Sequence, residues 1–189
     1  MQIMVSCLLF FLTFSCLAIP IVKRVQTFYQ ISGNTEQALR QQLNQLGPTV
    51  NNEHFDSKTT WHITWTYTWQ FDNQLETTCS IKDVSVSVKI NTLFPQWIDQ
   101  YNASPALKTK WNNYLTALQI HEQEHEYNGL KAAQEIEAAL LQTSSMPSCE
   151  ELQTKLETTA ITILKQHHIW DQQFDLETNH GKNQGAVFP

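Results

Sequence analysis

Large apolar side chains alternate with smaller polar ones in two stretches of this chain, and a period of two is typical of β-strands. Between Trp61 and Trp69 every second residue is aromatic or Ile, with Thr and His between them, and residues 84–90 repeat the alternation with Val and Ile. We expect these two strands to pair antiparallel, with the aromatic face in the core, after a shorter strand at residues 27–31.

Apolar residues recur every three or four positions in three other stretches, as they do in amphipathic helices. These stretches cover residues 35–46, 104–142 and 148–170. The second opens with Ser104-Pro105, which combines an N-cap residue with proline at the first helical position. Residues 171–189 lack such a period, and we expect them to form an irregular tail.

The second predicted helix contains the run His121-Glu122-Gln123-Glu124-His125, which matches the pattern H-E-x-x-H. Because residues four apart share a helix face, His121 and His125 can bind one metal ion with Glu122 beside them. In zinc hydrolases the two imidazoles bind Zn²⁺ and the Glu takes a proton from a zinc-bound water. The alternative without function is that these residues lie on a solvent-exposed helix face. Their spacing instead places them on the face that is predicted to be buried, where polar groups need partners.

A catalytic zinc site needs a third protein ligand. The extended pattern with a third His six residues after the second fails, because that position is Lys131. A carboxylate from the next helix would make Glu150, Glu151 or Glu157 the ligand, whereas a His from the tail would make it His180.

The N-terminus resembles a secretory signal. An apolar run over residues 3–17 ends at Ala18, followed by Ile19-Pro20, and it is too short for a comfortable membrane anchor. The residues before Cys16 fit a lipobox poorly. We therefore expect residues 1–18 to be a signal peptide and residues 19–189 to be one exported domain, periplasmic or secreted, without stable membrane insertion.

Signal removal leaves two cysteines, Cys79 and Cys149. In an exported chain two cysteines most simply form one disulfide bond, which here would close a long loop. The alternative, Cys as a metal ligand, favours close pairs of the C-x-x-C type, and the sequence has none. We expect a Cys79–Cys149 bond.

Taken together, these features resemble the bacterial domain of unknown function family nine hundred and twenty-two, whose members are regarded as secreted or periplasmic zinc-dependent proteases. The resemblance covers the exported part, including the Trp-rich strand, both cysteines and H-E-x-x-H. Its most distinctive part is the C-terminal pattern T-x-H-G-x-x-Q-G-A, which spans Thr178 to Ala186. The chain departs from the pattern at Phe174, where Tyr is expected.

The tail around His180 carries glycines that would let it fold back over the helix. We therefore favour His180 as the third zinc ligand over Glu157. Asp175 would then orient a ligand imidazole from outside the coordination sphere.

These inferences combine into one prediction of fold and function. We expect an α+β fold in which a small antiparallel sheet packs on the long H-E-x-x-H helix and a second, C-terminal helix, in a zincin-like arrangement. The net charge of −6 with 12 Lys and Arg argues against nucleic acid as a partner. The predicted function is a zinc metallopeptidase with a protein or peptide substrate. The alternative is a noncatalytic envelope binding protein with a structural or vestigial metal site.

The signal sequence makes a first prediction. Mass spectrometry of the exported protein should find Ile19 at the mature N-terminus, because the small-residue site ends at Ala18. A diacylated product beginning at Cys16 would instead identify a lipoprotein.

Overall fold

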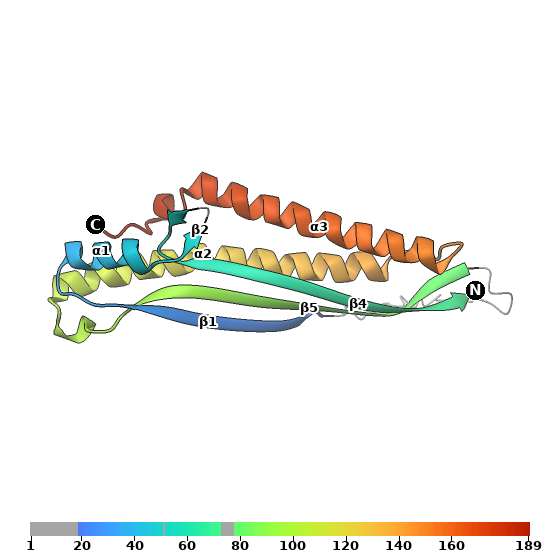
Figure 1. The fold of residues 1–189 in the computed structure, drawn as a ribbon, viewed down its shortest axis with the longest axis horizontal. Helices are drawn as coiled ribbons and strands as arrows, with labels where there is room; N and C mark the ends of the chain where they lie inside the picture. The colour runs from blue at the N-terminus through green and yellow to red at the C-terminus, as the bar shows by residue number, and fades with distance from the viewer. Residues whose placement is uncertain (1–18, 51, 73–77) are drawn as a thin grey trace, which may run out of the picture.

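The chain folds into an elongated molecule in which two long helices lie along one side of a three-stranded sheet (Figure 1). The computed structural model describes residues 19–50, 52–72 and 78–189, and the predicted signal peptide lies outside them. Two long strands, β4 (Lys58–Asp72) and β5 (Thr78–Trp97), follow β1 (Ile21–Ile31) in the chain.

The three strands stand in the order β1-β5-β4. β4 and β5 are antiparallel, with Trp61 opposite Ile90, as the alternating pattern predicted. β1 runs parallel to β5, so the expectation of a purely antiparallel sheet is wrong and the sheet is mixed. The reason lies in connectivity: β1 reaches the sheet through a long connection, and only a tight hairpin would force neighbouring strands to run antiparallel.

The helices begin where the sequence patterns predicted. They are α1 (Glu36–Leu46), α2 (Pro105–Leu141) and α3 (Cys149–Thr178). The hydroxyls of the N-cap residues Thr35, Ser104 and Ser148 each accept a hydrogen bond from the backbone N–H three residues on, at 3.2–3.3 Å. The short elements are β2 (Thr49–Val50), β3 (Glu53–His54), η1 (Gln100–Asn102) and η2 (Lys182–Gln184).

The third helix is longer than predicted. Residues 171–178, expected to be irregular, continue α3 to a left-handed cap at Asn179, whose φ is 50°. The helical period is hidden there because the side chains that α3 turns toward α2 at this end include Asp171 and Asp175 rather than aliphatic residues. A search for apolar periodicity misses a helix whose contact face is polar.

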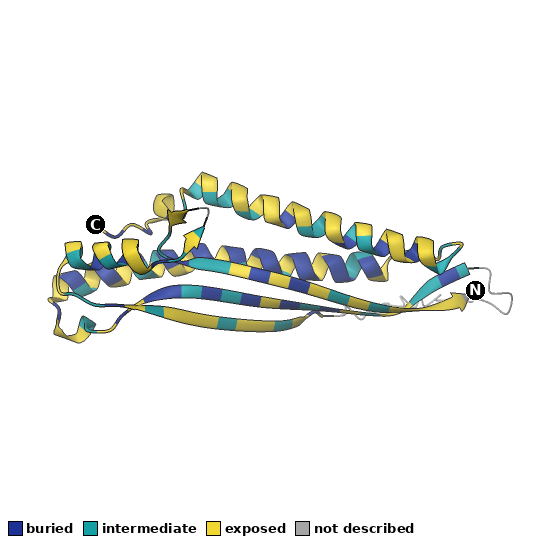
Figure 2. Cartoon of the chain, viewed as in Figure 1, coloured by how far each residue is buried: buried dark blue, intermediate teal, exposed yellow. Residues whose placement is uncertain are grey.

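Two apolar clusters lie along the helices, and Figure 2 shows the buried stripe that α2 turns toward its neighbours. One cluster joins β4 and β5 to the C-terminal half of α2 and the N-terminal half of α3. The other joins α1, the end of β5, the N-terminal half of α2 and the C-terminal tail. Between them, α2 buries four polar residues: His121, Glu122, His125 and Asn128.

The aromatic face of β4 packs against the helices over most of its length. Trp61 is 8% exposed and lies so close to Gly129 that a Cβ there would be 2.5 Å from its Cγ. Trp65 and Tyr67 both donate hydrogen bonds to Glu157, at 3.2 and 2.7 Å. Of the helices in the described part of the chain, none combines the length and apolar character needed to cross a membrane.

The predicted cysteine pairing is present in the structure. Cys79 and Cys149 form a disulfide bond with a Cα–Cα distance of 5.1 Å, and they are 70 residues apart in sequence. Cys79 also exchanges two backbone hydrogen bonds with Met146. The start of β5 is thus joined to the start of α3.

Removing the disulfide should destabilise the fold. The double variant Cys79→Ala/Cys149→Ala is expected to lose about 4 kcal/mol of unfolding free energy, since a crosslink of this loop length restricts the unfolded chain. Denaturant unfolding of the oxidised protein and the variant measures the difference, and the reduced wild type is the matched control. Equal midpoints for oxidised and reduced protein would show that the bond contributes nothing.

Candidate metal centre

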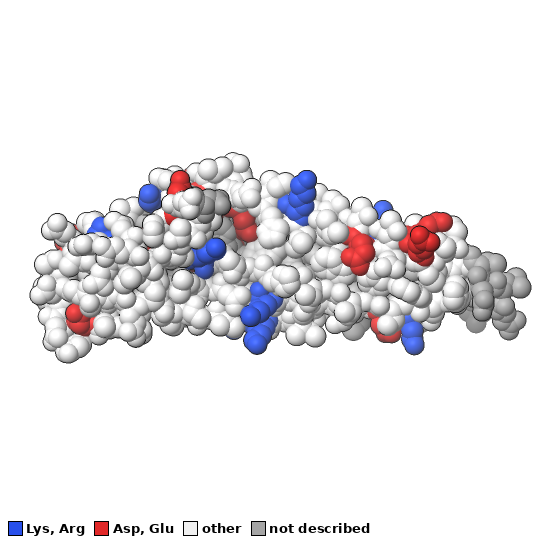
Figure 3. Space-filling model, viewed as in Figure 1, with Lys and Arg blue, Asp and Glu red and all other residues white. Residues whose placement is uncertain are grey.

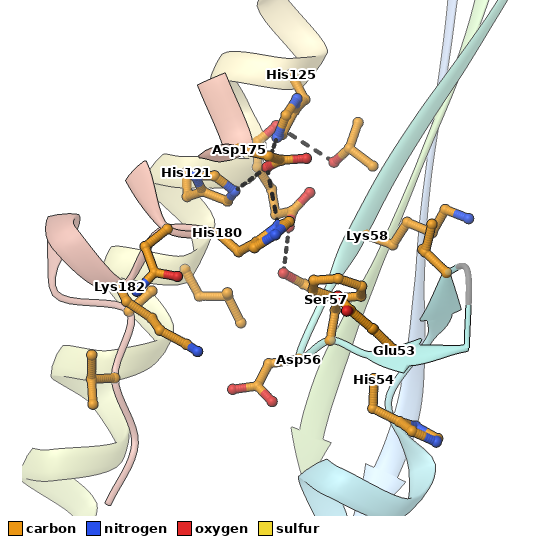
Figure 4. Close-up of a pocket in the computed structure, with 18 of the residues that line it drawn as sticks. Glu53, His54, Asp56, Ser57, Lys58, His121, His125, Asp175, His180 and Lys182 are labelled. Atoms are coloured by element: carbon orange, nitrogen blue, oxygen red, sulfur yellow. Dashed lines mark hydrogen bonds and ion pairs between the residues drawn. The ribbon is translucent and has the colours of Figure 1, made fainter. Parts of the chain in front are cut away.

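Three potential metal ligands converge where α2 and α3 face each other. His121 and His125 lie in the middle of α2 and are 3% and 7% exposed. Oδ1 of Asp175, from α3, lies 3.2 Å from Nε2 of His121 and 3.0 Å from Nε2 of His125. All three ligand atoms lie within 4.8 Å of one another. Figure 4 shows the three side chains pointing toward a common centre.

The spacing of these atoms fits a small cation. A tetrahedral ion with bonds of about 2.0–2.2 Å holds its ligand atoms roughly 3.3–3.6 Å apart. The two distances to Asp175 are within about 0.3 Å of that range. Two imidazole nitrogens and one carboxylate oxygen are also ligand types that Zn²⁺ accepts.

Hydrogen bonds orient both imidazoles. Nδ1–H of His121 donates to Oε1 of Gln184, and Nδ1–H of His125 donates to Oδ1 of Asp171, each at 2.9 Å. A neutral ring with its proton on Nδ1 has its lone pair on Nε2. Both Nε2 atoms are therefore directed at Asp175, and each would offer its lone pair to a metal ion once it gives up its proton.

The electrostatics show how strongly this place attracts positive charge. Burial lowers the pKa of His125, but hydrogen bonds to Asp171 and Asp175 outweigh it and raise that pKa to about 10. Burial raises the pKa of Asp175, but its hydrogen bonds with His121 and His125 outweigh that effect and hold this pKa well below its usual range. Asp175 is therefore ionised, and a metal cation would take the place of a proton between these groups.

The side chain of Glu122, which follows His121 in the chain, has one buried oxygen without a hydrogen-bond partner among the described residues. Its side chain is buried, the residue being 4% exposed, and Oε1 accepts a hydrogen bond of 2.5 Å from the hydroxyl of Ser57. Oε2 has no hydrogen-bond partner among the described residues. A buried carboxylate oxygen without a partner is costly unless it meets a group absent from the protein itself, such as water or substrate.

The residue before Ser57, Asp56, is fixed by an ion pair and hydrogen bonds to three other residues. The carboxylate of Asp56 pairs with Arg40 of α1 and accepts a hydrogen bond from Tyr114 at 2.8 Å, and its carbonyl accepts one from Tyr29 at 2.7 Å. Burial raises the pKa of both tyrosines, so both remain neutral donors. The loop that presents Ser57 to Glu122 is thus fixed from several elements.

His180 lies beside the group rather than in it. The chain turns left-handed at Asn179 and His180, with φ values of 50° and 51°. Nδ1 of His180 is 3.6 Å from Oδ1 of Asp175, its side chain is 38% exposed, and its ring packs on Phe55. The sequence suggested His180 as ligand and Asp175 outside the sphere, whereas the geometry favours Asp175 as the third ligand.

Glu157, the alternative ligand, lies far from the site. It is 18 residues before Asp175 on α3, or about 27 Å along the helix. Its carboxylate accepts hydrogen bonds from Trp65 and Tyr67 instead.

The C-terminal tail closes over His121. At Gly181, where φ is 78°, a Cβ would lie 3.0 Å from Cγ of His121, so the approach requires glycine. Phe188 then packs against both Trp111 and Tyr114, with ring centroids 5.4 and 5.3 Å away. This anchoring holds Gln184 on the imidazole.

The sequence reasoning did not assign a role to three residues that contact the candidate site: Ser57, Asp171 and Gln184. Only Gln184 had a signal, as the conspicuous Gln of the T-x-H-G-x-x-Q-G-A pattern. Asp171 and Ser57 are brought to the site by tertiary contacts alone.

The candidate ligands open onto a pocket of about 880 Å³. Its walls come from α1, the loop between β3 and β4, α2, the end of α3 and the C-terminal tail. Figure 4 shows Ser57 facing the ligand group across this space, with Lys58 and Lys182 on opposite sides.

Comparison with known proteins gives a family but no activity. The chain matches, over residues 26–181, the family described as Bacterial protein of unknown function (DUF922). No curated protein and no solved structure matches it. A zincin-like relationship therefore remains a prediction.

The geometry predicts different effects for the two candidate third ligands. Asp175→Asn should weaken zinc binding by more than about a hundredfold, because it removes the charged ligand atom. This loss exceeds the roughly ten- to hundredfold loss that is typical for a residue that only hydrogen-bonds to a ligand. His180→Gln should weaken binding by less than about tenfold, since its nitrogen lies outside the ligand group. Competition with a chromophoric chelator measures both, and the reverse order of effects would return His180 to the ligand set.

Proposed function

The chain belongs to this family of bacterial proteins of unknown function, and we propose from its buried site that it is an exported zinc-dependent peptidase. One observation carries the proposal. Glu122, whose buried Oε2 has no partner among the described residues, lines the same pocket as the three residues whose ligand atoms converge. A base without a partner beside an open metal position is the arrangement that hydrolysis needs.

Three protein ligands favour catalysis over a structural role for the metal. Structural zinc is usually closed by four protein ligands, whereas catalytic zinc keeps an open position. Among the described residues the group comprises His121, His125 and Asp175. This difference supports the peptidase over a binding protein with structural zinc.

Each residue has a distinct task in the proposed hydrolysis. Zn²⁺, when bound, supplies a Lewis acid that polarises a carbonyl and lowers the pKa of water. Glu122 accepts the proton of the attacking water through Oε2 and returns it to the leaving amine. The Ser57 hydroxyl donates to Oε1 and so leaves Oε2 as the oxygen that is available to act as the base.

His180 is the donor we assign to the substrate carbonyl oxygen. His180 lines the pocket next to Asp175, and its ring is partly exposed. The backbone N–H of His180 donates a hydrogen bond to the carbonyl of Asp175 at 2.8 Å, which fixes the position of the residue. A fixed imidazole near the ligand group can stabilise negative charge that develops on the carbonyl oxygen.

The pocket and the disulfide support an extracytoplasmic peptide substrate. A space of about 880 Å³ is within the range of ligand sites and admits several side chains. On the face drawn in Figure 3, Lys and Arg stand apart from one another among Asp and Glu, without a broad basic surface. The Cys79–Cys149 bond favours an oxidising compartment, as expected for export.

Replacing Glu122 should separate chemistry from metal binding. Glu122→Gln keeps the shape but removes the base, so zinc should stay bound while peptide hydrolysis falls by roughly a hundredfold or more. The matched control is Glu124→Gln, since Glu124 is in the same motif but exposed. His121→Ala should lose both metal and activity.

The assay uses metal analysis and cleavage of a peptide library by the mature protein. Full activity of Glu122→Gln on a peptide that the wild type cleaves would remove Glu122 as general base. A wild type that binds zinc but cleaves no peptide would favour the binding-protein alternative.

A further inference from the structure

The metal centre is one end of a longer series of buried polar contacts between α2 and α3. On α2 the participants are His125, Asn128 and Glu135, and on α3 they are Asp171 and His167. We propose that Asn128 and His167 are positioning residues that act through Asp171 to hold His125 for metal binding, and that His167 is a buried cation. The effect on metal affinity rests on the proposed function.

The orientation of the Asn128 amide is determined by its neighbours. Its Nδ2 donates to Oδ1 of Asp171 at 2.9 Å and to the carbonyl of His167 at 3.0 Å. Both partners are acceptors, so the NH₂ group must be on that side. Oδ1 of Asn128 is therefore the atom that faces Nδ1 of His167, at 2.6 Å.

The same reasoning assigns both protons of His167. Nδ1 must carry a hydrogen because the amide oxygen of Asn128 can only accept. Nε2 lies 3.0 Å from Oε2 of Glu135, a carboxylate oxygen that also accepts. A neutral imidazole has one N–H, so the ring that satisfies both contacts is the imidazolium.

The surroundings support this charge. His167 is 8% exposed, and a buried cation needs a charged partner, which Glu135 provides at the half-exposed end of the series. Lys131, one turn earlier on α2, lies 3.8 Å from the other oxygen of Glu135. Glu135 thus links the buried ring to the surface.

The series reaches the metal centre through Asp171. Its Oδ1 accepts from both His125 and Asn128, and its Oδ2 accepts from Nε1 of Trp61 at 2.8 Å. Loss of the Asn128 contact would let the carboxylate rotate about the remaining bonds. The ring of His125 would then lose the partner that aims Nε2 at the site.

Two substitutions of one residue test the inference. In His167→Asn the side-chain amide nitrogen takes the place of Nδ1 and can still donate to Asn128, whereas in His167→Gln it takes the place of Nε2 and cannot. Zinc affinity should fall roughly ten- to hundredfold in His167→Gln. His167→Asn should keep most of the wild-type zinc affinity, although both variants remove the ring and its charge. The matched control, His62→Gln at an exposed position of β4, should bind like the wild type.

The outcomes separate this inference from the proposed function. An equal loss of zinc affinity in both His167 variants would show that only the packing of the ring matters. No loss of affinity in either variant would show that the series of contacts does not affect the metal site. Either result overturns the inference but leaves zinc binding by the wild type intact. A wild type without zinc affinity would overturn the proposed function and the effect on affinity together.

The charge of His167 has its own test without metal. Nitrogen-15 NMR of the metal-free wild type at neutral pH should show two protonated ring nitrogens for His167, assigned by their loss in His167→Gln. A ring with one unprotonated nitrogen would overturn the assignment of a buried cation.

Discussion

The structure depends on how four buried polar residues in the middle of α2 are satisfied. His121, Glu122, His125 and Asn128 lie between two apolar clusters, where an unpaired polar group costs several kcal/mol. α3 and the C-terminal tail supply partners for His121, His125 and Asn128 through Asp171, Asp175 and Gln184. The partner of Glu122 is Ser57, from the loop before β4. The apolar clusters hold the helices together, and the polar contacts determine which residues must face each other.

The partners that satisfy α2 also fix the geometry of the candidate site. Nε2 of each histidine faces Asp175, and one oxygen of Glu122 has no partner among the described residues. Because the supporting residues come from α1, β4, α3 and the tail, little reorganisation is needed when a ligand enters. Such preorganisation is what the proposed function requires, beyond a helix that contains His and Glu.

The C-terminal segment has a structural task that explains its composition. Gly181 permits close approach to His121, Gln184 fixes its tautomer, and Phe188 anchors the segment in the apolar cluster around Trp111. The chain end thus acts as a cover over this part of α2. The same turn places His180 at the pocket wall.

Local patterns in the sequence determined the helix starts, the antiparallel pairing of β4 with β5, the disulfide partners and the H-E-x-x-H pair. Each depends on residues close in sequence or on a simple count. Only the tertiary structure decided that β1 runs parallel to β5, that α3 continues past Asp171, and that Asp175 rather than His180 meets the two imidazoles. These features depend on contacts between distant segments. The C-terminal part of α3 has no apolar periodicity from which a helix could be predicted, because the side chains that it turns toward the buried polar residues of α2 are themselves polar.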